Sequence, residues 1–214
     1  MESNRRRFLQ CVAGGTAALS LSKNKLSADD NPSQPVYSDE IFKIIKERRS
    51  VRKFKPTPVP HEHLMQILEA ANYAPTPRNR QAWIFLVIQK REIIDQIKET
   101  CIQAAGEDSR QYYTDYLSAP VYVEVLAYTK TRNPQNDITA GVLAAENLML
   151  AARTLGYGTV FCVNSIPAEA TKGILNIPDE YQRICITPIG IPDEWPATPE
   201  KKKTEDVVMY DRFG

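Results

Sequence analysis

Histidine is almost absent from this chain. Its 214 residues include two histidines, His61 and His63, which flank one glutamate. A zinc site needs three or four ligands in a suitable arrangement, and this pair has no further histidine to join it. The sequence therefore predicts no metal site, and it offers little for a serine–histidine–aspartate triad.

Cysteine is also scarce, and no two cysteines have the short spacing of a zinc or redox motif. The four are Cys11, Cys101, Cys162 and Cys185. Cys11 lies in a basic N-terminal leader, and the remaining three are an odd number. A disulfide framework is therefore not expected, and these three are expected to be small buried hydrophobic residues.

The chain has no excess of either charge. Lysine and arginine number 27 against 26 aspartates and glutamates, a formal net charge of +1, so charge does not indicate a nucleic-acid partner. No apolar run after the leader approaches the roughly 20 residues that span a bilayer, so no stable membrane span is expected. The glycine fingerprint GxGxxG of dinucleotide-binding folds is missing as well.

Residues 1–34 differ from the rest of the chain. Arg5, Arg6 and Arg7 precede Phe8-Leu9, and a weakly apolar run rich in alanine and glycine follows. A basic segment, a short apolar segment and small residues are the parts of a secretory signal, and RRRFL resembles the bacterial twin-arginine (Tat) signal. We expect residues 1–34 to be a signal and linker, residues 35–214 to form one domain, and the protein to be exported to the periplasm. The alternative is a disordered basic tail on a cytoplasmic protein.

Apolar periodicity predicts the helices and strands of the domain. Helices are expected from Ser38 to the residue before Arg48, from Pro60 to before Pro75, and over residues 91–104, 137–155 and 168–175. Strands are expected over residues 83–88, 121–128, 157–163 and 183–189, and an extra strand is suggested over 206–210. Because the first two helices have no strand between them, we expect an α+β domain, a sheet flanked by helices, in place of a doubly wound fold.

The stretch Arg48-Arg49-Ser50-Val51-Arg52 directly follows the first predicted helix. Three guanidinium groups and a hydroxyl lie within five residues, and arginine offers a planar set of donors that matches phosphate oxygens. In an extended backbone, Arg48, Ser50 and Arg52 point to one side and can converge on one anion. Taken alone, such a cluster is more typical of a solvated surface.

A second polar stretch, APTPRNRQAW over residues 74–83, lies between a predicted helix and a predicted strand. It carries two prolines and two primary amides, Asn79 and Gln81. An amide side chain holds both a donor and an acceptor, which suits a flavin or ribityl chain with its carbonyls, ring nitrogens and hydroxyls. Taken alone, this stretch is also typical of an ordinary loop with satisfied polar residues.

Together these residues resemble the nitroreductase-like family of flavoproteins. The family's first motif, RRS-x-R, is matched by Arg48, Arg49, Ser50 and Arg52. Its second, AP-[ST]-x-x-N-x-Q-P-W, is matched by Ala74, Pro75, Thr76, Asn79, Gln81 and Trp83, with Ala82 in place of the usual proline. Glu146 and Asn147 in the long predicted helix, and Gly190-Ile191-Pro192 before a basic run, match later parts of the pattern.

The resemblance implies a nitroreductase-like mixed sheet flanked by helices, and a homodimer with FMN at the subunit interface. Four residues would hold the phosphate and ribityl end of FMN: Arg48, Arg49, Ser50 and Arg52. Asn79 and Gln81 would come from the partner subunit or the facing loop. The family often has an arginine on the phosphate near the C-terminus, where this chain has Lys201, with Lys203 nearby. Lysine serves a phosphate as a point charge and not as a planar fork.

The resemblance also implies an oxidoreductase that takes hydride from NADH or NADPH and reduces a small acceptor such as a nitroaromatic or a quinone. No catalytic side chain is expected, because the flavin carries the redox chemistry. A non-catalytic FMN-binding or redox-sensor protein is the alternative. The tyrosine-rich segment 110–116 is expected either to cover the flavin or to pack at a helix or dimer interface. Relatives that dehalogenate iodotyrosines have a longer charged lid there, so deiodination is not expected.

Overall fold

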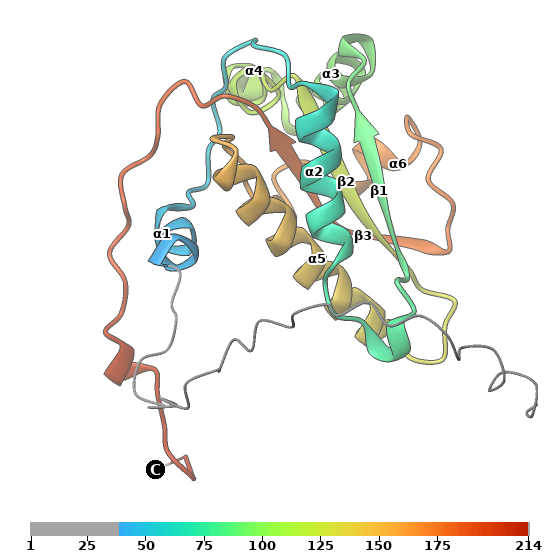
Figure 1. Ribbon diagram of the computed structural model, residues 1–214. Coiled ribbons are helices and arrows are strands. Elements are labelled where there is room, and N and C mark those ends of the chain that lie inside the picture. Colours follow the sequence, from blue (N-terminus) through green and yellow to red (C-terminus); the bar gives the residue numbers. More distant parts are fainter. Residues whose placement is uncertain (1–38, 214) are drawn as a thin grey trace, which may run out of the picture. The chain divides into compact units, whose positions relative to one another are not determined.

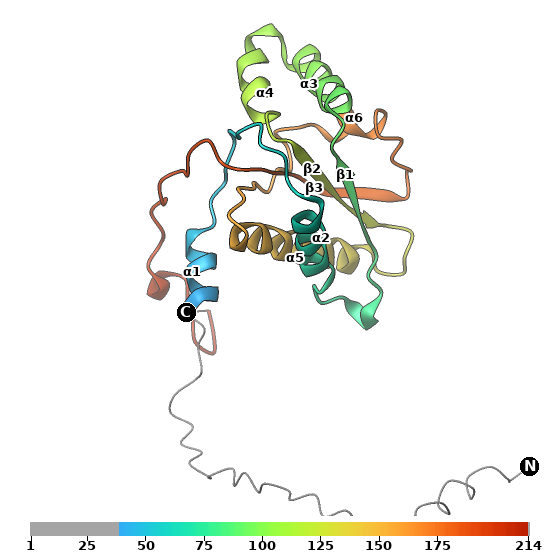
Figure 2. The same cartoon turned by 45° about the horizontal axis from the view of Figure 1, so that its top comes forward.

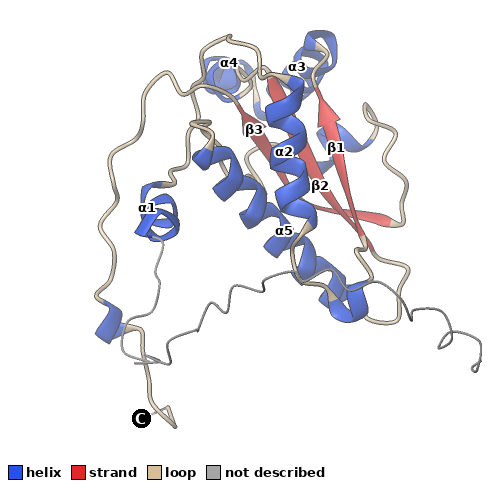
Figure 3. Ribbon diagram, viewed as in Figure 1, coloured by secondary structure: helices blue, strands red, loops and turns tan. Residues whose placement is uncertain are grey.

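The computed structural model describes residues 39–213, so the predicted leader and linker, and the predicted cap at Ser38, lie outside the described residues. The sheet has three antiparallel strands in the order β1-β2-β3, namely β1 (Trp83–Ile88), β2 (Val121–Tyr128) and β3 (Tyr181–Ile189). Helices cover both of its faces (Figures 1 and 3). The predicted α+β class is confirmed. Within residues 39–213, no helix has the length and apolarity to cross a membrane.

Two long helices pack on one face of the sheet. They are α2 (His61–Asn72) and α5 (Pro134–Thr154), and the predicted helices at these places are confirmed (Figures 1 and 2). Their apolar faces share one buried cluster with Val123 and Val125 of β2. Gly141 lets α5 approach β3 closely, because a Cβ there would lie 2.9 Å from Ile184 Cγ1. α5 therefore packs closely along the sheet. Its first turn pairs with Arg80 and its last turn with Glu47.

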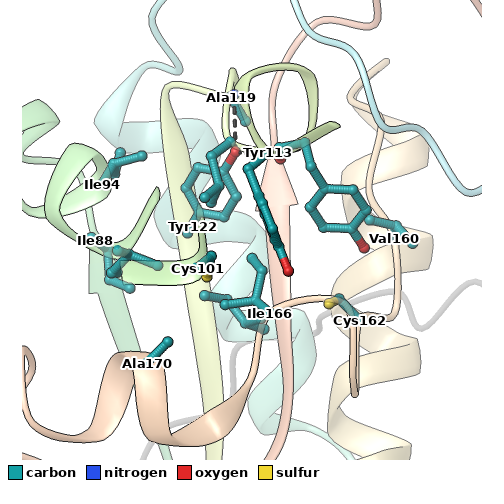
Figure 4. Close-up of a cluster of buried hydrophobic side chains, with 14 of the residues drawn as sticks. Ile88, Ile94, Cys101, Tyr113, Ala119, Tyr122, Val160, Cys162, Ile166 and Ala170 are labelled. Carbon is teal, nitrogen blue, oxygen red and sulfur yellow. Dashed lines mark hydrogen bonds between the residues drawn. The ribbon is translucent and has the colours of Figure 1, made fainter. Parts of the chain in front are cut away.

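Three further helices cover the other face. They are α3 (Arg91–Ala105), α4 (Arg110–Tyr116) and α6 (Ala168–Lys172). Figure 4 shows the cluster beneath them, where the Tyr122 hydroxyl donates to the carbonyl oxygen of Tyr116 at 2.9 Å and accepts from the backbone N–H of Ala119 at 3.1 Å. Tyr113 and Tyr116 are buried in this cluster, whereas Tyr112 is 46% exposed. Packing thus accounts for two tyrosines of the tyrosine-rich segment.

The three cysteines of the domain are buried and free, as predicted. They are Cys101, Cys162 and Cys185. Burial raises the pKa of the Cys101 thiol to about 11 and that of the Cys185 thiol to about 12. A thiol with so high a pKa is a poor nucleophile at neutral pH, so these side chains serve packing.

Two predicted strands do not form. Residues 157–163 make isolated bridges to two segments: Gly158 pairs with Gly190 and Cys162 with Ile186, in one antiparallel register at β3, and Thr159 pairs with Ser50. The Ser50 bridge is parallel and the other two are antiparallel, so no one neighbour extends into a ladder. Residues 206–210 also form no strand. A short 3-10 helix, η3 (Thr204–Asp206), ends there, and no strand among residues 39–213 pairs with the tail.

Glu124 on β2 is a buried acidic side chain on the face of the sheet that α3, α4 and α6 cover. Its Oε1 accepts a hydrogen bond from the Thr171 hydroxyl at 3.0 Å and lies 3.8 Å from Arg183 Nε. Its Oε2 is buried and has no hydrogen-bond partner among the described residues. Burial raises the pKa of this carboxyl, although Arg183 and Thr171 act in the opposite direction. The folded protein therefore binds the proton of Glu124 more tightly than the unfolded chain does.

We expect Glu124→Gln to alter the pH dependence of stability. A carboxyl whose pKa is higher in the folded state binds its proton more tightly there, so its contribution to the free energy of unfolding is complete below the unfolded pKa of about 4.3 and is lost as pH rises through the folded pKa. Glutamine has no such step. In urea titrations, the free energy of unfolding of the wild type minus that of the variant should fall as pH rises above about 4.3, the unfolded pKa. A difference that rises with pH would contradict the assignment.

Candidate functional site

The arginine stretch begins where the first helix, α1 (Asp39–Glu47), ends. The chain becomes extended there, and the backbone N–H of Val51 donates to the carbonyl oxygen of Thr159 at 2.9 Å. Val51 is 1% exposed. Because neighbouring side chains of an extended chain point to opposite sides, the burial of Val51 turns Ser50 and Arg52 outward. The predicted geometry of the stretch is therefore present.

Gly158 makes room for this buried anchor. The N–H of Gly158 donates to the carbonyl oxygen of Gly190 at 2.9 Å. A Cβ on Gly158 would lie 2.7 Å from Val51 Cγ2 and 2.8 Å from Pro192 Cγ, closer than real Cβ contacts. A side chain at 158 would therefore displace Val51, and the residues on either side of Val51 would move with it.

A cavity of about 740 Å³ opens beside the arginine stretch. One side is lined by Ile45, Lys46, Arg48, Arg49, Ser50 and Arg52, and the other by Pro196, Ala197, Thr198, Pro199 and Lys201. The lining contains no carboxylate and has five cationic side chains: Lys46, Arg48, Arg49, Arg52 and Lys201. Ser50 also lines it, so five of the predicted phosphate ligands meet in one place. Lys203 does not line the cavity.

Most of the arginine donors remain available within this cavity. Arg49 Nη1 donates to the carbonyl oxygens of Lys46 at 2.5 Å and Arg48 at 2.7 Å. Its Nη2 donates to the Thr198 hydroxyl across the cavity. Arg52 Nη1 donates to the Ser50 carbonyl oxygen at 3.2 Å. A guanidinium has five N–H donors, so unspent donors face a space with no competing acid. This donor set fits a phosphate group.

One acidic side chain outside the lining pairs with the arginine stretch. Arg48 Nε is 3.7 Å from Glu146 Oε1 on α5, and both side chains are partly exposed. An ion pair of this length in contact with water is weak. Arg48 is therefore free to turn toward an anion in the cavity.

The second predicted set lies on the loop between α2 and β1, which contains the 3-10 helix η1 (Pro77–Asn79). Asn79 and Gln81 are exposed, and both have positive φ, 54° and 49°, as does Arg78 at 57°. Residues other than glycine rarely adopt this left-handed region, and such strain gathers at functional sites. Arg80 holds the loop in place by donating Nε and Nη2 to Asp137 Oδ1, at 3.1 and 2.6 Å.

One chain does not bring the two predicted sets together. The loop is tied to Asp137 near the start of α5, whereas the end of α1 is tied to Arg153 near its end, where Arg153 Nη2 lies 2.8 Å from Glu47 Oε2. These anchors are 16 residues apart, which is about 24 Å along a helix. Figures 1 and 2 show the loop away from α1 in both views. Neither Asn79 nor Gln81 lines the arginine cavity.

The comparison with known families decides the affiliation. Residues 45–191 match the model of the Nitroreductase family. The chain belongs to this family. That match begins inside α1 and ends after β3, so it takes in the arginine stretch and the loop with Asn79 and Gln81.

Individual relatives agree with the family. A protein of Methanothermobacter thermautotrophicus, provisionally named NADH dehydrogenase/NAD(P)H nitroreductase, is 29% identical over 164 residues, 74% of this chain and 81% of the relative. The iodotyrosine deiodinase of Thermotoga neapolitana is 27% identical over 188 residues, 81% of this chain and 98% of the relative. A crystal structure of a nitroreductase with bound FMN from Desulfitobacterium hafniense has a TM-score of 0.64 at 25% identity and covers 81% of this chain and 98% of that one. The nitroreductase fold is thus established.

Sequence reasoning missed three residues that shape the site. Thr198 contacts Arg49 across the cavity, Asp137 holds the loop through Arg80, and Arg153 pairs with Glu47. Asp137 lies in the first turn of a predicted helix and Arg153 in its last, places where charges commonly serve the helix dipole alone. No local pattern marks them as neighbours of a site.

Proposed function

We propose that this protein is an FMN-dependent oxidoreductase that takes hydride from NADH or NADPH and reduces a small acceptor such as a nitroaromatic or a quinone. The observation that carries the proposal is the cavity with five cationic side chains and no carboxylate, built on the arginine stretch. A phosphate is the anion that best matches a set of guanidinium donors and a hydroxyl. A nitroreductase with bound FMN among the structural relatives makes FMN the phosphate-bearing cofactor of choice.

In this proposal, the chain supplies binding and orientation. Arg48, Arg49, Ser50 and Arg52 hold the phosphate, and Lys201 adds a positive charge from the opposite wall of the cavity. When bound, FMN supplies the redox chemistry by accepting a hydride and passing its electrons to the acceptor. The amides of Asn79 and Gln81 offer donors and acceptors to the polar edge of the flavin ring or to the ribityl chain.

The proposal includes a homodimer, because the two sets of residues lie at opposite ends of α5. α1 has no buried residue, and its Ile41 and Ile45 are exposed. These two also line a groove of about 500 Å³ between α1 and α5, and Val142 and Leu143 on α5 are exposed as well. An apolar helix face on the surface is a common site of association. A second copy on this face would cover it and bring its own Asn79 and Gln81 to the arginine cavity.

The choice of acceptor rests on the segment between α3 and β2. Residues 107–116 form the 3-10 helix η2 (Glu107–Ser109) and α4, and Tyr113 and Tyr116 of α4 are buried in the core. Two short helices leave little room here for the longer charged lid of the relatives that dehalogenate iodotyrosines. This arrangement favours a nitroaromatic or a quinone over an iodotyrosine, the substrate in the name of one relative.

The proposal is tested on the purified full-length protein. It is expected to be yellow, to release FMN on denaturation, to be bleached by NADH or NADPH, and to be reoxidised by a nitroaromatic or a quinone. Iodotyrosine serves as the contrasting acceptor. A colourless protein that takes up no FMN would remove the proposal. Bound FMN that neither NADH nor NADPH bleaches would point to the alternative, an FMN-binding or redox-sensor protein.

A further inference from the structure

Arg153 makes an unusual set of contacts for a residue at the end of a helix. Its Nη2 lies 2.8 Å from Glu47 Oε2 at the end of α1. Its guanidinium carbon lies 4.1 Å from the centre of the Trp195 ring, within the range of a cation–π interaction. Its Nε is buried and has no hydrogen-bond partner among the described residues. Arg153 thus joins three segments of the chain: α1, α5 and the segment after β3.

The two segments that Arg153 joins to α5 lead directly into the walls of the arginine cavity. Glu47 precedes Arg48 on one wall, and Trp195 precedes Pro196 on the other. Across the cavity itself, Arg49 on one wall donates a hydrogen bond to the Thr198 hydroxyl on the other. The segment after β3 passes alongside α1 in both views of the chain (Figures 1 and 2). The spacing of the walls therefore depends on what holds Glu47 and Trp195 to α5.

α1 depends on the same end of α5. It has no buried residue of its own, and two ion pairs join its end, and the residue after it, to α5. Glu47 pairs with Arg153, and the next residue, Arg48, pairs with Glu146 at 3.7 Å. Glu146 and Arg153 are seven residues apart and so lie on one face of α5. The ion pair of Arg153 is the shorter of the two, and Arg153 also contacts Trp195, which leads into the second wall.

We propose that Arg153 is a positioning residue for the phosphate end of FMN, acting through Glu47 and Trp195 to hold the two walls of the cavity at the spacing that the phosphate requires. Arg153 does not line the cavity, so it acts on the phosphate only through the residues beside it. The inference rests on the proposed FMN-dependent function. It assigns the cation–π contact with Trp195 to cofactor binding and not to general stability.

The test compares the binding of FMN with that of riboflavin, which lacks the phosphate, to the flavin-free full-length chain. Arg153→Met keeps an unbranched side chain of similar reach but removes the charge. We expect it to weaken FMN binding about tenfold, the loss that a partly buried cation–π contact with an ion pair represents, and to leave riboflavin binding unchanged. Arg153→Lys should restore most of the affinity, because lysine keeps a cation near Glu47 and the ring.

Two controls make the result specific. Arg91→Met removes an arginine from an ion pair of similar length, 2.7 Å to Asp95 on α3, and should leave FMN binding unchanged. Trp195→Ala removes the aromatic partner of Arg153 from an exposed segment. It should weaken FMN binding as much as Arg153→Met does, and the double variant should bind FMN no more weakly than either single variant. If Arg153→Met fails to fold, Trp195→Ala carries the same test.

Either of two results would overturn the inference: FMN binding in both variants as tight as in the wild type, or an equal loss of FMN and riboflavin binding. The same titration of the wild type separates this from the proposed function. A wild-type chain that binds no FMN overturns the proposed function itself. If the wild type binds FMN and Arg153→Met binds it with the same affinity, only the role of Arg153 is overturned.

Discussion

Replacing Arg48 and Arg52 together with alanine is expected to raise the dissociation constant for FMN at least about 100-fold. Both side chains line the cavity, and no carboxylate lines it to compete with a phosphate. A hydrogen bond to a charged group contributes about 1.5–3 kcal/mol, and about 1.4 kcal/mol corresponds to a tenfold change. Two such losses give about 3 kcal/mol at the lower bound. The measurement is the fluorescence titration of the flavin-free protein with FMN.

A control with the same change in net charge separates local contacts from the overall field. Arg91 and Lys98 both pair with Asp95 on α3, on the other face of the sheet from α5. The double replacement of these two by alanine removes two positive charges away from the cavity, so FMN binding should change little. The double variant of Arg48 and Arg52 should also lose most of the salt dependence of FMN binding. Equal FMN affinity in the two double variants would mean that the arginine stretch does not bind the phosphate.

Much of the fold was predictable because apolar periodicity survives in the long elements. β1, β2 and α5 lie within a few residues of their predicted bounds. The failure at residues 157–163 has a physical cause. The run is apolar enough for a strand, but its antiparallel pairing with β3 is limited to bridges at Gly158 and Cys162, and Thr159 between them pairs with Ser50. Composition does not reveal how continuous a pairing is.

The candidate site was predictable on one wall only. Arginine and serine donors at close spacing carry their chemistry in the sequence, so residues 48–52 stood out. The opposite wall, Pro196 to Pro199, has few charged or amide groups, and Thr198 gains its contact with Arg49 only when the chain folds back. The charge of the far wall comes from Lys201, which lines the cavity, whereas Lys203 does not. The two lysines are only two residues apart in the chain, and the fold decides which of them reaches the cavity.

Replacing Asp137 with alanine is expected to have the largest effect on stability. Asp137 is 1% exposed, and its two oxygens accept from Arg80 at 2.6 Å and from the Thr131 hydroxyl at 2.5 Å. Breaking a buried ion pair costs about 3–5 kcal/mol because a charge is left uncompensated. Arg80 is 29% exposed and can turn to water, so we expect about 3 kcal/mol, the lower bound of that range. In a domain of this size, the melting temperature should fall by about 6–12 °C.

The matched control is Asp95→Ala, which removes the same carboxylate from two partners on an exposed helix. Surface pairs of this kind contribute at most about 1 kcal/mol, so thermal unfolding should show a small shift. An equal shift in the two variants would mean that Asp137 is not the buried anchor of the loop. Asp137→Asn keeps the size of the side chain and an acceptor, and should fall between them.

The same substitution reaches the proposed site, because Arg80 lies between Asn79 and Gln81 in the chain. Without Asp137, the Arg80 side chain has no hydrogen-bond or ion-pair partner among residues 39–213. The left-handed backbone at residues 79 and 81 then loses the anchor that offsets its strain. We therefore expect Asp137→Ala to weaken FMN and riboflavin binding together at a temperature where the variant is folded, since the amides serve the ring or ribityl chain. The arginine variants should weaken FMN alone. Such a difference between the variants would assign the ring or ribityl part of FMN to the loop at one end of α5 and the phosphate to the arginine stretch at the other.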